Sequence, residues 1–197
     1  LEQLDDYAKA QGSNITIVKL DLGQEHAKIY ELAAIIAERF KKLDILVCNA
    51  AMLGMTGPLI HNDHDAIHKI ININLVANFA LLRAFEPVLN AADHGRIIAL
   101  TSSAASSKPA YFGPYNMTKS ALEAMVQTYA KEISQSNIKA NLVDPGIVQT
   151  KMLEQWLPGA EHPDARQPQD ITDIFVELAV NNLAINGQIL KAQKVDA

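Results

Sequence analysis

Apolar positions along the chain follow two kinds of spacing. In the first, apolar residues recur every three or four positions, as on one face of a helix, over 1–10, 25–40, 64–89, 115–134 and 170–180. In the second, short apolar runs bounded by turn residues indicate strands, over 15–20, 43–49, 96–101, 140–143 and 188–191. Gly12 is expected to close the first helix, and Pro87 to kink or end the third. The pattern therefore predicts a chain in which helices and strands alternate.

The predicted strands are apolar along their length instead of alternating apolar and polar residues. Strands of this kind are buried on both faces, and with intervening helices they indicate a parallel sheet covered on both sides. We therefore expect an α/β fold, a doubly wound parallel sheet of the Rossmann type, forming a single domain over 1–197. Residues 151–168, rich in Pro and carrying Trp156, are expected to form a lid-like excursion from this domain.

Polar residues follow the predicted strands at the ends where parallel α/β sheets bind ligands. They are Asp21, Asn49, residues 101–103 and Asp144, the last followed by the turn Pro145-Gly146. Because the carboxyl ends of parallel strands share one edge of the sheet, this edge is predicted to hold the functional site.

Composition narrows the classes of protein that the chain can represent. With 197 residues, 49% of them hydrophobic and 20% charged, it can bury one sizeable core. A net charge of −5 gives no electrostatic reason to expect nucleic-acid binding. No apolar run approaches the roughly 18 residues of a membrane helix, no signal peptide is visible, and the single cysteine, Cys48, excludes a disulfide within the chain. We expect a cytoplasmic protein with neither a nucleic-acid nor a membrane partner.

The first candidate chemistry is the pair Tyr115 and Lys119. Four residues apart on a helix, the two side chains project from the same face, one turn from each other. A neighbouring ammonium lowers the pKa of a phenol from its usual value near 10 towards neutrality. The pair is therefore a candidate general acid and base, although the same spacing also occurs on ordinary solvated helices.

Further motifs in the same order give the chain a resemblance to the short-chain dehydrogenase/reductase family over essentially its whole length. They are Asn49-Ala50-Ala51 after a strand, Asn72-Ile73-Asn74-Leu75 in a helix, 95–102 ending in Ser102, Tyr115-x-x-x-Lys119, and Pro145-Gly146 followed by Thr150. Within the family, 113–115 and 168–171 are similar to a bacterial branch of uncharacterised oxidoreductases. Cys48 and Ala51 depart mildly from the family pattern, which has Asn and Gly there.

The resemblance implies hydride transfer between a nicotinamide cofactor, NAD or NADP, and a small-molecule carbonyl or alcohol. It implies that Tyr115 moves the proton, that Ser102 binds the substrate oxygen, that Lys119 lowers the pKa of Tyr115 and contacts the nicotinamide ribose, and that Asn74 holds a proton-carrying water. By the same resemblance, the residues expected to contact the cofactor are Asp21, Asn49, Ala50, Tyr115, Lys119, Pro145, Gly146 and Thr150.

The resemblance also implies a homodimer or homotetramer. Helices 64–89 and 115–134 would pair across a two-fold axis through outward apolar positions. These positions include Phe79, Leu82, Met125 and Tyr129.

The family pattern begins with a strand, a Gly-rich turn and a helix that receive the dinucleotide pyrophosphate. This first β-α-β unit has no counterpart here, so we expect the sequence to be N-terminally incomplete. Residues 1–197 alone are expected to be poorly soluble and to bind no dinucleotide, because sheet edges and anion-binding amides would be missing.

Simpler roles compete with several of these assignments. Asp21 and Asn49 are also suited to capping strand ends, and Ser103 stands beside Ser102. His61, His64 and His68 invite a metal interpretation, but no third-ligand segment is evident, and Asn62 or Asp63 suits a helix N-cap. Cys48 is expected to be a small buried apolar residue.

The sequence therefore leaves two functional classes open. The first is an NAD(P)-dependent oxidoreductase. The second is a catalytically inactive fragment, or a non-enzymatic partner-binding domain that has lost its cofactor loop. The sequence gives neither the substrate nor the choice between NAD and NADP.

Overall fold

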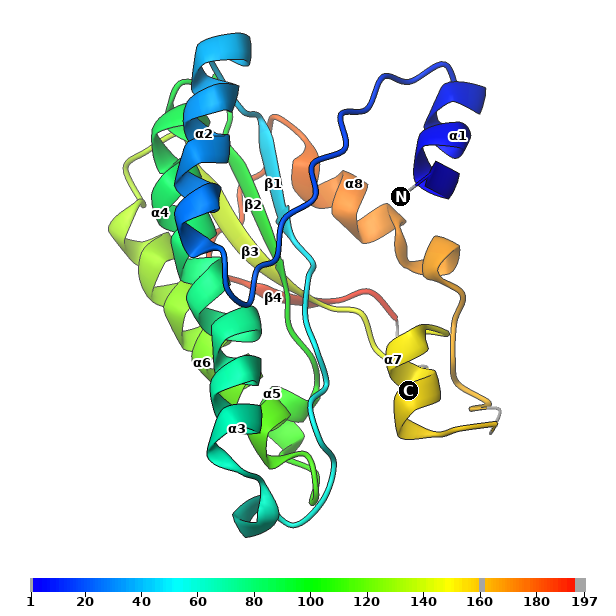
Figure 1. Cartoon of the computed structure of the whole chain (residues 1–197). Helices are drawn as coiled ribbons and strands as arrows, with labels where there is room; N and C mark the ends of the chain where they lie inside the picture. The colour runs from blue at the N-terminus through cyan, green and yellow to red at the C-terminus, as the bar shows by residue number, and fades with distance from the viewer. Residues whose placement is uncertain (1, 160–161, 194–197) are drawn as a thin grey trace.

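The sheet at the centre of the molecule is parallel throughout. The computed structural model describes residues 2–159 and 162–193, and its four strands lie in the order β1 (Ile45–Cys48), β2 (Arg96–Leu100), β3 (Lys139–Asp144) and β4 (Ile189–Lys191) (Figure 1). Ile45 pairs with Arg96, Arg96 with Lys139, and Leu142 with Ile189, so the first three strands start level. The predicted parallel sheet is confirmed.

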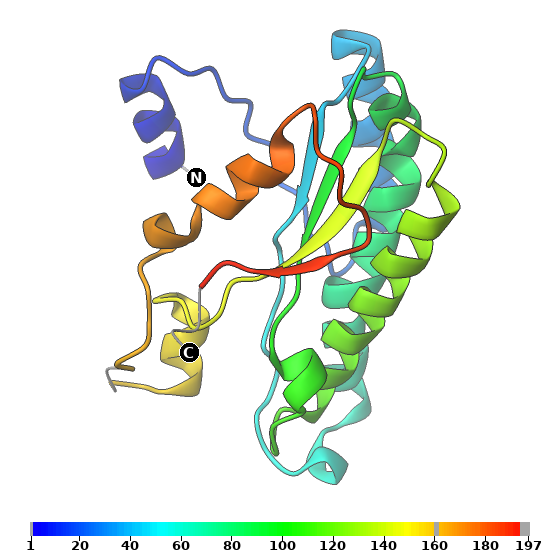
Figure 2. The same ribbon diagram turned by 180° about the vertical axis from the view of Figure 1, so that it is seen from behind.

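Helices cover both faces of the sheet, as expected for a doubly wound α/β fold. One face carries α2 (His26–Phe40), α4 (Ala77–Asn90) and α6 (Gly113–Glu132), and the other carries α8 (Asp173–Ala179) (Figure 1). Figure 2 shows α1 (Glu2–Ala10) on the same side of the sheet as α8. The 3-10 turn η3 (Pro168–Ile171) leads into α8.

The two sides of the sheet bury separate apolar clusters. The larger includes Ile29 of α2, Leu89 of α4, Ile97 of β2 and Leu122 of α6, each at most 1% exposed. The smaller joins Ile98, Val143 and Leu178 beneath α8. Because Ile97 and Ile98 are adjacent on β2, they point to opposite faces of the sheet and serve opposite clusters.

The long helical pattern at 64–89 is continuous but not uniform. It comprises α3 (His64–Ile71), the π-helical turn η2 (Asn72–Val76) and α4. Asp63 caps α3, because its Oδ1 accepts the Ala66 N–H at 2.7 Å. The expectation that Pro87 kinks or ends the helix is wrong about the end, since α4 continues to Asn90 with Pro87 inside it.

The predicted strand at 15–20 is not present. That segment has no regular secondary structure, and Ile15, Ile17 and Val18 are 38%, 38% and 52% exposed. A strand exists only through the hydrogen bonds of a neighbour, and no ladder within the described residues includes this segment. Its β-branched composition alone therefore did not decide its conformation.

Short elements surround the carboxyl ends of the strands. They are the 3-10 turn η1 (Leu59–His61), α5 (Ala104–Ser107) and α7 (Lys151–Trp156). The region expected as an excursion thus contains a helix, and a parallel bridge joins Val148 to Arg166. Among the residues that the structure describes, no helix has the length and apolarity needed to cross a membrane.

Candidate active site

The candidate site lies at the carboxyl ends of β1, β2 and β3, as the position of the polar residues predicted. Ser102 follows β2, whereas Tyr115 and Lys119 occupy the first two turns of α6. Pro114 near the start of α6 suits that position, because a proline there loses no helical hydrogen bond. Gly113 lies against the Leu59 side chain, since a Cβ at this position would lie 2.5 Å from Cδ1 of Leu59. The start of α6 therefore contacts η1 closely.

Tyr115 and Ser102 form the centre of the site. The Tyr115 side chain is 9% exposed, and the Ser102 side chain lies close enough to act on its pKa. Burial raises the pKa of Tyr115, while the neighbouring Ser102 hydroxyl acts to lower it. The Ser102 oxygen also accepts the Ala104 N–H at 3.3 Å. In this structure Tyr115 is a protonated phenol at neutral pH, held beside a half-exposed hydroxyl.

Lys119 is buried one turn after Tyr115. Its side chain is 3% exposed, Nζ lies 5.7 Å from the centroid of the Tyr115 ring, and Nζ donates to the Leu100 carbonyl oxygen at 2.7 Å. Burial lowers the pKa of Lys119 to about 8. The expected lowering of the Tyr115 pKa by Lys119 is not observed, because burial raises that pKa and the group that acts to lower it is Ser102.

Asn74 ties the π-helical turn to the loop after β1 and to α6. It is fully buried, its Oδ1 accepts the Met52 N–H at 2.9 Å, and its Nδ2 donates to the Met52 carbonyl at 2.9 Å and to Thr118 Oγ1 at 3.1 Å. Its own carbonyl accepts Asn78 Nδ2 at 2.8 Å. Both amide hydrogens are therefore committed, so only an oxygen of Asn74 is left to hold a water. The water-holding role stays a prediction.

Thr118 and Glu123 are parts of this arrangement that the sequence did not single out. The Thr118 hydroxyl donates to the Tyr115 carbonyl at 3.0 Å while it accepts from Asn74. Thr101, beside Ser102, donates to Glu123 Oε1 at 2.6 Å. The position of Thr118, three residues after Tyr115, was a signal in the sequence for its hydrogen bond to the Tyr115 carbonyl. Nothing in the spacing of the sequence indicated the hydrogen bond between Thr101 and Glu123.

The residues expected at the nucleotide end line a separate groove. A hollow of about 740 Å³ lies between the loop that follows 15–20 and the loop that follows β1, lined by Asp21, Gly23, Ala50, Met52 and neighbouring residues. Asp21 Oδ1 accepts the Gly23 N–H at 2.8 Å. Asn49 and Ala50 are exposed at the end of β1. The structure thus brings Asp21 and Ala50 to one hollow, but it does not bury them.

The turn after β3 is occupied by a side chain from near the end of the described residues. Gln193 Nε2 donates to the carbonyls of Pro145 at 3.0 Å and Ile147 at 2.7 Å. Gly146 has φ +69°, and a Cβ there would lie 2.7 Å from Gln193 Cδ. The Thr150 hydroxyl caps α7 by accepting the Leu153 N–H at 3.3 Å. Thr150 therefore has a structural role beside its predicted cofactor contact.

The remaining candidates have ordinary structural roles. Cys48 is buried and free, and burial raises its pKa to about 12, as suits a packed apolar residue. Across residues 2–159 and 162–193, no group of three or more His, Cys, Asp or Glu side chains is placed to hold a metal ion.

Comparison with known proteins identifies a family model and relatives that the chain resembles. A family model described as enoyl-(acyl carrier protein) reductase matches residues 1–192. An uncharacterised NAD-dependent oxidoreductase of Mycobacterium tuberculosis is 32% identical over 189 residues, covering 87% of this chain and 68% of the relative. The chain spans about half the length of curated mammalian relatives that it matches, at 51% and 50%.

Solved structures share the fold. A candidate short chain dehydrogenase of Pseudomonas syringae superposes with a TM-score of 0.92 at 30% identity, covering 98% of this chain and 79% of the other. A candidate short chain dehydrogenase of Shigella flexneri, solved in complex with NADP, gives a TM-score of 0.92 at 26% identity, covering 98% and 82%.

Proposed function

The chain belongs to the short-chain dehydrogenase/reductase family, and on this premise we propose that its whole protein is an NAD(P)-dependent oxidoreductase acting on a carbonyl or alcohol. The observation that carries the proposal is the placement of Ser102 beside the Tyr115 side chain, with the buried Lys119 ammonium one turn away. A partner-binding domain has no need to place a buried lysine against a buried tyrosine. Burial of a charged group destabilises the fold unless it is compensated, so a function is the simpler explanation for keeping Lys119 there.

The arrangement supports proton transfer to a substrate oxygen. With its pKa raised, Tyr115 carries its proton at neutral pH and is ready to donate it as carbonyl reduction requires. Ser102, half-exposed beside it, is placed to donate a hydrogen bond to the same oxygen. The phenolate that remains is stabilised by Ser102 and by the Lys119 charge. In the reverse direction, Tyr115 would accept the alcohol proton.

One observed feature supports the binding of a dinucleotide by the residues present. The hollow bordered by Asp21 and Ala50 reaches Met52, and the Met52 backbone is bonded to Asn74 of the catalytic group. Asp21, Asn49 and Ala50 would hold the nucleotide end, and Lys119 the nicotinamide ribose. When bound, the nicotinamide supplies the hydride, and the protein's part is to position and protonate. The relative of M. tuberculosis is named for NAD and the structure from S. flexneri contains NADP, so both dinucleotides are candidates.

Direct hydride transfer tests the proposal. The full-length protein is incubated with a panel of ketones and with NADH or NADPH deuterated at the transferable carbon. The expected result is deuterium at the carbinol carbon of the product, from one of the two cofactors preferentially. Absence of label from every ketone with both cofactors would leave the partner-binding alternative in place.

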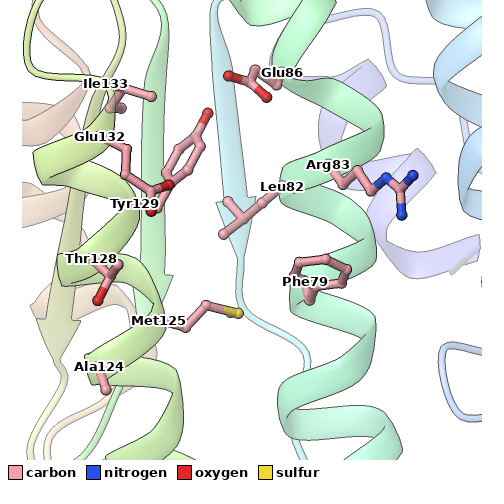
Figure 3. A pocket seen from close by; sticks show the side chains of 10 residues that line it. All are labelled: Phe79, Leu82, Arg83, Glu86, Ala124, Met125, Thr128, Tyr129, Glu132 and Ile133. Atoms are coloured by element: carbon pink, nitrogen blue, oxygen red, sulfur yellow. The ribbon is translucent and has the colours of Figure 1, made fainter.

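We also propose that α4 and α6 pair with a second copy of the chain. Figure 3 shows side chains of both helices around a groove of about 620 Å³, whose lining includes Phe79, Leu82, Arg83 and Glu86 of α4 and Met125, Tyr129 and Glu132 of α6. Phe79 is 50% exposed. The Tyr129 oxygen is buried yet makes no hydrogen bond of ordinary geometry within the described chain, and burial followed by the Glu86 charge raises its pKa.

Both signs of charge on this surface suit a two-fold contact, because Arg83 of one copy can face Glu86 or Glu132 of the other. Light scattering at micromolar concentration of the full-length protein should report a dimer or a larger oligomer. Phe79→Asp should shift it towards monomer, whereas the control Tyr7→Asp, at an exposed aromatic residue on α1, should not. A monomeric wild type would contradict the assignment.

A further inference from the structure

The surface beside Tyr115 is apolar. Tyr115 packs in a cluster with Leu53, Ile70 and Ala104, and the half-buried Met52, Phe112 and Met152 pack against it. The half-buried members Met52, Phe112 and Met152 form the accessible edge of this cluster. We call this edge, beside Tyr115, the apolar wall.

The helix α7 extends that wall with an aromatic side chain. Met152 and Trp156 are four residues apart on α7, so they lie on the same face of the helix. The Trp156 ring meets the Phe112 ring edge to face, with centroids 5.3 Å apart and planes at 83°. This is a favoured aromatic arrangement, yet Trp156 remains 38% exposed. Trp156 and Phe112 thus form an aromatic corner continuous with the Tyr115 cluster.

Backbone contacts hold α7 in this position. Gln155 Nε2 donates to the Gly54 carbonyl at 3.2 Å, which joins α7 to the loop carrying Met52 and Leu53. Leu153 is 7% exposed and its N–H is capped by Thr150. The wall is therefore assembled from three segments distant in sequence: 52–54, 112–115 and 152–156.

The three segments that form the wall, 52–54, 112–115 and 152–156, contain no Lys, Arg or His. Lys119 is 3% exposed and donates to Leu100, so it does not reach the surface of the wall. His162 lies beyond the aromatic corner, with its ring centroid 6.3 Å from that of Trp156, and its Nδ1 accepts the Asp164 N–H at 3.2 Å. A substrate carboxylate placed against these three segments would therefore lose its hydration without gaining a cation from them. That loss is costly.

Resting on the proposed oxidoreductase function, we propose that the substrate is an uncharged carbonyl compound, or the corresponding alcohol, with an apolar ring-sized substituent held by Phe112 and Trp156. In the reducing direction the hydride of the nicotinamide adds to the carbonyl carbon and the Tyr115 proton goes to the oxygen. The substituent makes no bond in this step. Trp156 and Phe112 are accordingly specificity-determining residues, not catalytic ones.

A matched set of ketones tests the proposal in the full-length protein. Cyclohexyl methyl ketone should have a kcat/KM about 10-fold or more above that of its ring-carboxylated analogue, since the apolar wall offers the carboxylate no partner. Trp156→Ala and Phe112→Ala should each lower kcat/KM for cyclohexyl methyl ketone by about 10-fold or more. For acetone, which has no ring, the same variants should change kcat/KM by less than about threefold.

Two variants serve as controls for a general loss of structure. Trp156→Phe should retain most of the activity on the ring ketone, and Tyr7→Ala, at an exposed aromatic on α1, should retain all of it. An equal or higher kcat/KM for the carboxylated analogue would overturn the proposal. So would an unchanged kcat/KM of Trp156→Ala on the ring ketone.

A binding measurement separates this proposal from the proposed reaction. Residues 1–197 contain a single tryptophan, Trp156, so its emission reports on the wall once any tryptophan elsewhere in the full-length protein has been replaced by Phe. In a Tyr115→Phe background, with and without NADP, titration with cyclohexyl methyl ketone should change the emission saturably, and the carboxylated analogue should not. If the ring ketone binds but wild type shows no hydride transfer, the proposed oxidoreductase function is contradicted and the proposed binding surface is supported. If hydride transfer occurs but the ring ketone leaves the emission unchanged, only the proposed binding surface is contradicted.

Discussion

The two ends of the candidate site are built in opposite ways. At the catalytic end, Asn74, Tyr115 and Lys119 are at most 9% exposed and are joined to one another's segments by hydrogen bonds. At the nucleotide end, Asp21 and Asn49 are exposed on loops at the edge of the sheet. The arrangement at the proposed catalytic end is therefore part of the core, whereas the proposed nucleotide end is a surface. Substitutions at the first end should alter stability and chemistry together, and those at the second end should alter binding alone.

The largest effect is expected for Tyr115→Phe. The variant keeps the buried ring but removes the proton and the partner of Ser102, so kcat should fall by about 10²–10⁴. Binding of NADH or NADPH, followed by cofactor fluorescence, should change by less than about twofold, because the phenol proton is not needed to hold the nucleotide. Comparable turnover in the variant would remove Tyr115 from the proton-transfer role.

Asn74→Ala tests whether the catalytic end is part of the core. The change leaves the Met52 N–H and carbonyl without partners in a buried setting, so the free energy of unfolding should fall by about 2–4 kcal/mol. The matched control is Asn49→Ala at the nucleotide end, for which the change should stay within about 0.5 kcal/mol. Urea unfolding at a fixed pH measures both. Equal losses of unfolding free energy in Asn74→Ala and Asn49→Ala would contradict the proposed difference between the two ends of the site.

The variant Lys119→Met tests the effect of Lys119 on stability, through the pH dependence of the unfolding free energy, and its effect on function, through turnover. Burial lowers the folded pKa of Lys119 to about 8 from the usual lysine value of 10.5, so between these values the unfolded chain binds a proton that the folded protein does not. Stability contributed by this group therefore rises with pH across that window, by up to roughly 3 kcal/mol for a lysine.

The variant has no such group. The unfolding free energy of wild type minus that of the variant, from urea titrations between about pH 7 and 10, should therefore increase with pH, and the turnover of the variant should be lost. Burial raises the pKa of Cys48 to about 12 and also raises that of Tyr115, so both groups reduce stability as the pH becomes more alkaline, but both are present in the two proteins compared. A parallel pair of profiles below pH 10 would show that Lys119 is not desolvated.

Asp21→Asn should give the smallest effect. The side chain is exposed and keeps an oxygen to accept the Gly23 N–H, so the unfolding free energy should stay within about 0.5 kcal/mol. Affinity for dinucleotide should weaken by about 3- to 10-fold, because a neutral amide is a weaker acceptor than a carboxylate. Isothermal titration with NADH and NADPH measures the affinity. A stability loss like that of Asn74→Ala would show that the nucleotide end is also structural.

The sequence predicted the parts of the site that depend on local spacing. Tyr115 and Lys119 share a helix face because they are four residues apart, and Ser102 follows from the end of a strand. The partners of Asn74 were not predictable, because Met52 is 22 residues away and takes part through its backbone. Gln193 reaches the Pro145-Gly146 turn only because β4 lies next to β3.

The fold shows the same division between local and distant causes. The four strands of the described sheet, β1 to β4, were correctly predicted, since each has a hydrogen-bonded neighbour on at least one side. The run at 15–20 has the same composition but no ladder among the described residues, and it is not a strand. Similarly, the periodicity over 64–89 predicted a helix but not its π-helical turn, because one added residue leaves the apolar spacing almost unaltered.

The π-helical turn at η2 makes the candidate site sensitive to the length of the chain as well as to the identity of Asn74. One residue in a regular α-helix corresponds to a rotation of about 100°. Deleting Ile73 would let the turn relax to an ordinary helix, in which α3 and α4 keep nearly the same rotation relative to each other while Asn74 moves one position closer to α3. Asn74 would then point away from Met52 and Thr118, although all of the proposed catalytic residues would still be present in the chain. In this turn the number of residues is therefore as necessary as the Asn74 side chain for assembling the site.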